Sequence, residues 1–326
     1  MGAVAPWPRV AAVVVTYFPD LDRLRSVLGA LAGQVEAVFV VDNSADRLTT
    51  EGIAAACATT RAAMLPQPTN RGLAAGFNAG LRAARLAGFT HGLLMDQDSL
   101  PQDGMVRRLA ETWVTENPRG EVAAVGPSFF DPRGAVPASF SRVGFPANHP
   151  APATERGGAV CESDYLISSG CLIALEALDR VGELREDLFI DNVDMEWCFR
   201  ARGKGLRLLG EGAAVLEHEL GDRRVRLPFG RVAIVHGPRR LYYIMRNRVL
   251  LYWMRHVPWQ WKAQDLLRLP VKFLIFSLLV RPRLQNARHM VLGLWHGLVR
   301  RTGPFPATRS ASGGGRAAPV RPGSSA

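Results

Sequence analysis

The sequence has few cysteines and no long uninterrupted apolar run. Its cysteines show no C-x-x-C spacing, so we expect buried, reduced thiols in a cytoplasmic protein at Cys57, Cys161, Cys171 and Cys198. Residues 1–9 lack the charged and then apolar pattern of a signal peptide. The longest apolar stretch, residues 269–280, contains a proline and a lysine and is too short to span a bilayer. We therefore expect no part of the chain to cross a membrane.

Signatures of nucleic-acid binding are also missing, although the net charge is +11. We find no zinc-finger spacing, helix-turn-helix pattern or RRM box. The arginines gather within residues 200–301, between Trp, Tyr, Phe and Leu side chains. This distribution favours an anionic membrane surface over nucleic acid as the partner of the basic region. The composition as a whole, 48% hydrophobic and 21% charged, is typical of a folded globular protein.

The first hundred residues alternate between strand-like and helix-like patterns. Apolar runs typical of buried strands lie at residues 10–16, 37–41 and 90–95, with a shorter one at 64–66. Helix-like patterns follow Asp20, occupy residues 50–58 and begin again in the glycine-rich run 70–80. This alternation predicts an α/β fold with a doubly wound, mixed or mostly parallel sheet, which binds ligands at the carboxyl ends of its strands.

The rest of the chain divides by composition. We expect a helix at 105–114, strands at 122–125 and 166–173, a strand ending at 215–221, a Pro-, Gly- and Ala-rich loop at 127–160, and a helix at 239–248. Residues 249–301 carry amphipathic helix patterns. We therefore expect a catalytic and ligand-binding domain at 1–235, a C-terminal helical region at 236–302, and a disordered tail at 303–326 rich in Gly, Ser, Ala and Pro.

Two carboxylates, Asp96 and Asp98, follow directly on the apolar run that ends at Met95. Because side chains alternate along a strand, both acids would leave the sheet on the same side. Two hard oxygen donors so placed suit Mg²⁺ or Mn²⁺, which keeps further positions for water and phosphate oxygens. An acidic turn after a strand is the alternative interpretation.

Two further stretches present polar groups at predicted strand ends. Asp42 could accept hydrogen bonds from a ribose or a pyrimidine N–H, or it could cap the next helix. In the N-R-G-x-x-x-G-x-N-x-G run, Asn70 and Asn78 can present amides to a sugar or nucleotide, and Arg71 can meet phosphate. The alternative is a glycine-rich helix packed tightly on the sheet. No Walker loop is present, because no G-K-[ST] follows.

Four motifs in order resemble the inverting family 2 glycosyltransferases of GT-A fold, and among them the bacterial rhamnosyltransferase group. They are V-V-T-Y at 14–17, V-D-N at 41–43, N-R-G-x-A-A-G-x-N-x-G at 70–80 and M-D-Q-D-S at 95–99. The resemblance covers residues 10–300 and includes the string F-I-D-x-x-D-x-E-W-C at 189–198. It departs at Asn192, where relatives often carry an aromatic residue.

The resemblance implies a set of site residues. Asp194 would be the catalytic base that takes the acceptor's proton, with Asp191 as the alternative, and Glu196 would orient the acceptor or its loop. His218, in an element similar to the family's H-x-x-G, would complete a metal site with Asp96 and Asp98. A segment at Ser169 and Gly170 would border the acceptor site beneath the 127–160 loop. The candidate nucleotide- and substrate-binding residues are Thr16, Tyr17, Asp42, Asn43, Asn70, Arg71, Gly72, Asn78, Asp96, Gln97, Ser169, Gly170, Glu196, Trp197 and Arg246.

The basic region has two parts, and each part allows two interpretations. A helix would bring Arg239, Tyr243 and Arg246 together as a cationic, aromatic face for a diphosphate, or as an ordinary solvated face. Beyond residue 249, Trp and Arg suit helices lying in an anionic bilayer surface, which would place the protein on the inner face of the plasma membrane. The alternative is a packed helical subdomain or a homo-oligomer interface.

The function that the resemblance implies is metal-dependent transfer of L-rhamnose from dTDP-L-rhamnose, with Mn²⁺ or Mg²⁺ as cofactor. The acceptor would be a hydroxyl of a cell-surface glycan or of its polyprenyl-diphosphate-linked precursor. Other donors, such as UDP-galactofuranose, and a non-catalytic nucleotide-sugar-binding assembly protein are the alternatives. A nucleotidyltransferase would show a G-x-G-x-R/K loop after the first strand, where this chain has Tyr17-Phe18-Pro19.

Overall fold

The computed structural model describes residues 6–132, 140–151, 159–218, 223–226 and 232–306. The strands are β1 Val10–Thr16, β2 Ala37–Asp42, β3 Ala63–Pro66, β4 His91–Asp96, β5 Leu100–Pro101, β6 Val122–Phe130, β7 Ser141–Arg142, β8 His149–Pro150, β9 Val160–Glu162, β10 Leu172–Ala174, β11 Arg207–Glu217, β12 Arg223–Arg226 and β13 Val232–Val235. The helices are α1 Leu21–Ala32, α2 Arg47–Thr60, α3 Leu73–Leu86, α4 Met105–Glu116, α5 Leu175–Val181, α6 Val193–Gly203, α7 Pro238–Tyr252, α8 Trp259–Leu278 and α9 Arg283–Leu298, with a 3₁₀ turn, η1, at Glu186–Leu188.

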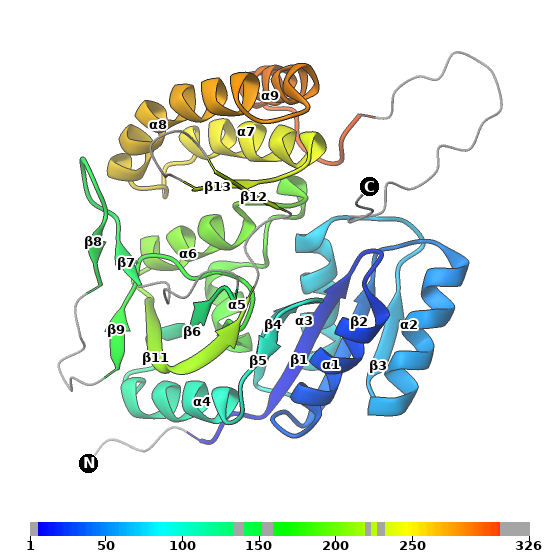
Figure 1. Ribbon diagram of the computed structural model, residues 1–326. Helices are drawn as coiled ribbons and strands as arrows, with labels where there is room; N and C mark the ends of the chain where they lie inside the picture. Colours follow the sequence, from blue (N-terminus) through cyan, green and yellow to red (C-terminus); the bar gives the residue numbers. More distant parts are fainter. Residues whose placement is uncertain (1–5, 133–139, 152–158, 219–222, 227–231, 307–326) are drawn as a thin grey trace.

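One mixed sheet organises the molecule, in the order β3-β2-β1-β4-β10-β6-β11-β5, with β9 paired to β11. Strands β3, β2, β1 and β4 run parallel to one another, whereas β10 is antiparallel to both of its neighbours, β4 and β6. The seven residues of β1 are all buried, as expected for a strand with helices on both faces of the sheet. Figure 1 shows the sheet flanked by helices, with α7, α8 and α9 stacked beyond α6. The predicted α/β class with a doubly wound, mostly parallel sheet is confirmed.

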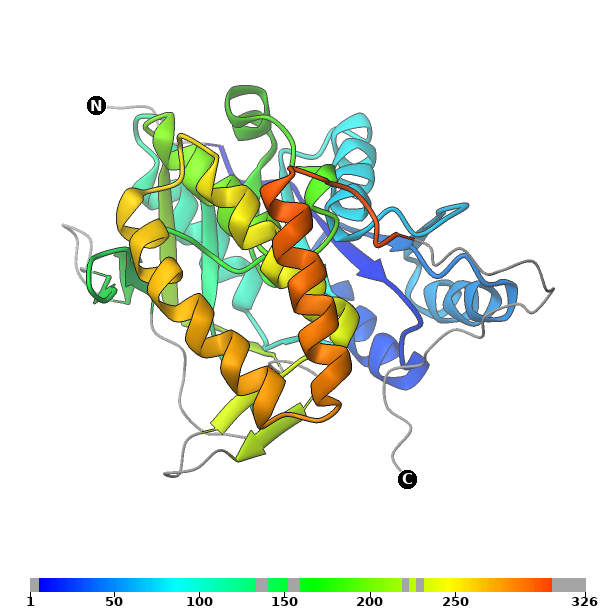
Figure 2. The ribbon, with the colours of Figure 1, turned by 90° about the horizontal axis from the view of Figure 1, so that it is seen from above.

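The three C-terminal helices pack around their own small core. It contains Leu241, Ile244, Met245, Leu269, Phe276, Val280 and Met290. Helix α9 comes close to α7 because Gly293 and Gly297 face it, and a side chain at Gly297 would meet Val249 at 2.6 Å. Figure 2 shows α8 and α9 as the outermost elements on this side. Among the described residues, no helix combines the length and apolar character that a bilayer crossing requires.

Several predicted boundaries were wrong. The strand expected at 166–173 is strand only from Leu172, because Gly170 adopts φ +79° and interrupts it. The strand expected to end within 215–221 is β11, which ends at Glu217 as predicted; its start at Arg207 was not predicted, since Gly210 and Gly212 obscured the pattern. The expected loop 127–160 contains the end of β6 and the short strands β7, β8 and the start of β9; its residues 133–139 and 152–158 lie outside the described part.

The expected disordered tail was placed too early. The amide N–H of Gly303 donates to the carbonyl of Asp187 over 2.7 Å. The Phe305 ring lies edge-on to Tyr242, with centroids 4.8 Å apart. Residues 303–306 are therefore packed against the protein, and residues 307–326 lie outside the described part.

Candidate active site

A cavity of about 190 Å³ opens at the carboxyl end of β4. Its walls come from distant parts of the chain: the end of β4, the segment before β10, the start of α6, the residue after β11 and the start of α7. Five of the predicted site residues line it, namely Asp96, Ser169, Asp191, Asp194 and His218. The structure therefore brings together carboxylates that are about a hundred positions apart in the sequence.

Asp96, Asp98 and His218 form the one group in the described part of the chain that could supply three ligand atoms to a metal ion. These atoms all lie within 4.8 Å of one another. The Ser99 hydroxyl is 2.6 Å from Nδ1 of His218. The same Nδ1 lies 4.0 Å from Oδ2 of Asp96, so the ring is held beside both Asp96 and Ser99. Two carboxylates and a neutral imidazole therefore fit Mn²⁺ or Mg²⁺.

Without a bound cation, the charged form of Asp96 is unfavourable in this cluster. Burial raises the pKa of Asp96 to about 6; His218 opposes this shift, whereas the Asp98 carboxylate adds to it. A bound cation would remove the repulsion between the two acids.

Asp194 is the carboxylate at the base of the cavity. Its Oδ2 accepts a hydrogen bond from the N–H of Ser168 over 3.2 Å, and its Oδ1 accepts one from the N–H of Met195 over 2.8 Å. Burial raises the pKa of Asp194, while these N–H groups oppose the shift. Asp191 is held differently, because Nε of Arg240 lies 3.1 Å from its Oδ1. The two acids thus face one cavity in different electrostatic settings.

A left-handed turn carries both acids into α6. Phe189, Asp191 and Asn192 have φ values of 68°, 64° and 61°, a conformation that costs roughly 1–3 kcal/mol for each non-glycine residue. The turn rests on the glycine-rich run, since the N–H of Leu73 donates to the carbonyl of Phe189 over 2.7 Å. Gly72 has φ +89°, and a Cβ there would lie 2.5 Å from that carbonyl oxygen. Only glycine fits this contact.

At the end of β2, the carboxylate of Asp42 is buried and held in place by hydrogen bonds from its neighbours. Its Oδ1 accepts from the N–H of Ser44 over 2.8 Å and from the hydroxyl of Thr16 over 3.3 Å. Its Oδ2 accepts from the Thr50 hydroxyl over 2.8 Å. The alternative that Asp42 caps α2 is wrong, because Asp46 occupies that position.

The neighbouring predicted residues also lie at this edge of the sheet. The N–H of Tyr17 donates to Oε1 of Gln97 over 2.7 Å, which ties the end of β1 to the acidic turn after β4. Asn43 donates to the carbonyl of Gly72 over 3.0 Å, and its own Oδ1 is buried without a partner. An unpartnered buried oxygen is an acceptor available to a ligand or water.

In the glycine-rich run, three predicted ligand-binding side chains bond to other groups of the protein. Oδ1 of Asn70 accepts the N–H of Gly72 over 2.9 Å, and Arg71 pairs with Glu186 over 3.0 Å. Asn78 is 1% exposed and exchanges hydrogen bonds with the backbone of Leu184 in both directions. These bonds join α3 to the segment before η1, and a role of Asn78 at a nucleotide stays a prediction.

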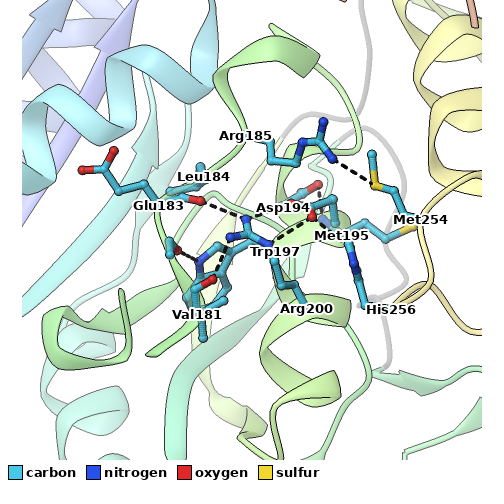
Figure 3. A network of polar contacts seen from close by, with 12 residues as sticks. Val181, Glu183, Leu184, Arg185, Asp194, Met195, Trp197, Arg200, Met254 and His256 are labelled. Carbon is cyan, nitrogen blue, oxygen red and sulfur yellow. Dashed lines mark hydrogen bonds and ion pairs between the residues drawn. The ribbon is translucent and has the colours of Figure 1, made fainter. Parts of the chain in front are cut away.

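Four further predicted site residues are buried. Trp197 is 2% exposed and donates from Nε1 to the carbonyl of Gly182, and Gly170 lies behind the cavity wall. Glu196 is fully buried and pairs with Arg200 over 2.9 Å. Arg200 also donates to the carbonyls of Val181 and Glu183 (Figure 3), and the expected role of Glu196 in orienting the acceptor or the loop stays a prediction. Arg246 is fully buried as well.

Sequence reasoning missed Arg240, the cation that does line the cavity. It lies at the start of α7, within the basic stretch from which Arg239, Tyr243 and Arg246 were selected by helical spacing. The helix turns Arg246 into the interior and leaves Arg240 beside Asp191, which only the packing of α7 could decide.

Residues 12–170 match the model of glycosyl transferase family 2. Over 270 residues, the chain is 28% identical to the dTDP-rhamnosyl transferase RfbF of Shigella flexneri, a match that covers 83% of this chain and 86% of that protein. Among solved structures, the mannosyltransferase PcManGT from Pyrobaculum calidifontis, in complex with GDP-Man and Mn²⁺, is similar with a TM-score of 0.55 and 15% identity over 91% of each chain. TarS 1–349 of S. aureus, in complex with UDP-GlcNAc, is similar with a TM-score of 0.54 and 18% identity over 90% of this chain and 81% of that one. The fold is that of the GT-A glycosyltransferases.

Proposed function

We propose that this protein, whose residues 12–170 match the model of glycosyl transferase family 2, transfers L-rhamnose from dTDP-L-rhamnose. The acceptor is a hydroxyl of a cell-surface glycan or of its polyprenyl-diphosphate-linked precursor. The observation that carries the donor is the similarity, across most of both chains, to a dTDP-rhamnosyl transferase. The glycosyltransferase class itself rests on the family and the fold together.

The cavity supports a single displacement with inversion. The Asp194 carboxylate takes the proton of the acceptor hydroxyl while that oxygen bonds to the anomeric carbon, and the bond from this carbon to the diphosphate oxygen breaks on the opposite face. Asp194 suits this step because burial raises its pKa and makes it a better proton acceptor than an ordinary surface carboxylate. Asp191 suits it less, since its charge is already paired with Arg240.

Asp96, Asp98 and His218 are the residues that would hold Mn²⁺ or Mg²⁺. Such an ion supplies positive charge to the departing diphosphate. Arg240, which lines the same cavity, offers a second positive charge. On the nucleotide side, Thr16, Asp42 and Asn43 offer polar atoms at the ends of β1 and β2, where such folds bind nucleotides.

The basic helices suit an anionic membrane surface, and we place the protein there as a peripheral enzyme on the inner face. The outward faces of α8 and α9 expose large apolar side chains: Trp259, Leu266, Leu267, Val271, Leu274, Leu278, Leu284, Val291, Trp295 and Leu298. Exposed arginines border them at Arg268, Arg281, Arg283, Arg288, Arg300 and Arg301. Asp265 is the one acidic residue between positions 236 and 306, and it is 4% exposed. Apolar area ringed by cations alone complements an anionic bilayer.

The donor is tested by equilibrium binding of dTDP-rhamnose, UDP-galactose and UDP-N-acetylglucosamine. Each is titrated with Mn²⁺, with Mg²⁺ and with chelator, against the wild type and Asp98→Ala. We expect metal-dependent preference for dTDP-rhamnose that the substitution abolishes. Preference for a UDP-sugar would overturn the donor while keeping the glycosyltransferase class, and failure to bind any of the three would favour a non-catalytic protein.

A further inference from the structure

Two adjacent side chains of α7, Arg246 and Asn247, are polar and yet fully buried. Both donate hydrogen bonds to the backbone of another element. Nη2 of Arg246 donates to the carbonyl of Leu188 over 2.7 Å. Nδ2 of Asn247 donates to the carbonyls of Leu188, Ile190 and Asp191 over 3.0, 2.7 and 2.8 Å. One side-chain amide therefore donates to three backbone carbonyls of the turn that precedes α6.

These acceptors belong to the left-handed turn described above. With positive φ at Phe189, Asp191 and Asn192, the turn is unfavourable for the residues that form it and persists only where its surroundings hold it. The carbonyl of Leu188 also accepts from Arg246 and from the N–H of Ile190 over 2.9 Å, so Asn247 matters most for the carbonyls of Ile190 and Asp191. The turn leads directly into Val193 and Asp194, so its conformation sets where the two cavity acids point.

A second set of contacts joins the same turn to the segment after α9. Arg246 donates to the carbonyl of Gly303, while the N–H of Gly303 donates to Asp187 over 2.7 Å. The ring of Phe189 stacks on Tyr243 with centroids 5.0 Å apart and planes at 9°. The Tyr243 hydroxyl in turn accepts the N–H of Phe305 over 2.6 Å. Helix α9 lies beside α7 (Figure 2), and the chain beyond it therefore closes over the turn.

We propose that Arg246 and Asn247 are positioning residues: they hold the 188–191 turn in its left-handed form and thereby aim Asp191 and Asp194 into the cavity. The consequence for catalysis rests on the proposed role of Asp194. The pair has no route to a diphosphate, because both side chains are fully buried. The helical region 238–306 is then a structural requirement of the active site as well as a surface of the protein.

The sharpest test is Asn247→Asp, which keeps the side-chain shape and replaces the donating amide by an acceptor. The matched control is Asn286→Asp. Asn286 is 1% exposed, belongs to the same three-helix unit, and donates to the carbonyls of Val280 and Phe276 over 3.0 and 3.3 Å, away from the cavity. Amide hydrogen exchange over residues 188–195, kcat, and the Kd for dTDP-rhamnose are measured in the full-length protein.

We expect Asn247→Asp to accelerate exchange over 188–195 and to lower kcat about 100-fold, the usual cost of misplacing a catalytic group by about 1 Å. The donor Kd should change little, because the metal-type cluster and the ends of β1 and β2 lie on other elements. Asn286→Asp should lower the Tm and leave exchange in the turn and kcat near wild type.

The proposal would be overturned if amide exchange over residues 188–195 were no faster in Asn247→Asp than in Asn286→Asp. Faster exchange with unchanged kcat would confirm that Asn247 holds the turn and would instead overturn the role of Asp194 as the base. Failure of this proposal and failure of the proposed function therefore give different results. If Asn247→Asp does not fold, Arg246→Lys serves in its place, since it keeps the charge and loses the fork that reaches Leu188 and Gly303. It too should loosen the turn, and an unchanged exchange pattern would overturn the proposal.

Discussion

Arg240 of α7 forms an ion pair with Asp191, its Nε lying 3.1 Å from Oδ1. This contact joins the helical region to the turn that carries both candidate bases. It also gives the two acids different surroundings, because Asp191 is paired with an arginine, whereas Asp194 accepts hydrogen bonds from the backbone N–H groups of Ser168 and Met195.

The first prediction follows from this difference. Asp194→Asn should lower kcat by about 10²–10⁴, the usual contribution of a general base, with donor binding retained. Asp191→Asn should reduce activity less and mainly through KM, since it frees Arg240 rather than removing the proton acceptor. Steady-state kinetics and donor titration of both variants give the comparison. A larger loss of kcat in Asp191→Asn would exchange the two roles.

The second prediction concerns pH. A base acts in its deprotonated form, and burial raises the pKa of Asp194 above the ordinary value of 3.8. Activity should therefore fall as pH decreases through this raised pKa, so the acid limb of kcat/KM should lie above the ordinary range of an aspartate carboxyl. The profile is measured at saturating Mn²⁺. An acid limb that is unchanged in the residual activity of Asp194→Asn would assign it to another group.

The third prediction concerns the support of the metal-type cluster. The Ser99 hydroxyl contacts Nδ1 of His218 at 2.6 Å, so Ser99→Ala should weaken Mn²⁺ affinity by about 10–100-fold, as loss of a hydrogen bond behind a metal-binding histidine usually does. Calorimetric titration with Mn²⁺ in the presence of dTDP measures this. Ser128→Ala is the control, because within the described part of the chain that hydroxyl donates to the carbonyls of Gly212 and Ala214. Equal affinities in the two variants would contradict a role for His218.

The fourth prediction concerns the outward face of α8 and α9. The double substitution Leu274→Asp and Leu278→Asp adds two negative charges to side chains that are 55% and 59% exposed, so folding should be preserved. Co-sedimentation with vesicles containing phosphatidylglycerol should fall sharply and should decrease with salt in the wild type. Leu86→Asp, on α3 and 90% exposed, is the matched control.

This experiment also tests the alternative use of the apolar face. Light scattering of the same proteins measures the oligomeric state. If the wild type is an oligomer that the double substitution dissociates, and no protein binds vesicles, the face is an interface between copies of this chain and the membrane proposal is wrong.

The order of strands and helices in the first hundred residues could be predicted because each element carries its own local signal. The run Val10–Thr16 is apolar throughout and forms a buried strand, and Asp20 caps α1 as its position before an apolar pattern indicates. Strand β11 could not be predicted in full, because its glycines give no periodic signal and pairing with β6 holds it in place.

The chemistry of the site could be predicted where the residue type alone limits what a side chain can do. Two carboxylates one residue apart at a strand end, and a histidine after another strand, do meet within 4.8 Å. Which polar side chains face the cavity was not readable. Asn78, Trp197 and Arg246 have the same chemical character in the interior as at a binding surface, and only the packing of α3, α6 and α7 shows that they are buried.

The sequence by itself therefore determined the fold class, the family motifs and the acids available for metal and proton chemistry, because these follow from local patterns of residue type. The tertiary structure alone decided that Arg240 rather than Arg246 reaches the cavity, and that Asn247 holds the turn beneath Asp191. Those facts depend on the direction in which one helix presents its side chains to a turn about sixty residues earlier, and no local pattern contains that direction.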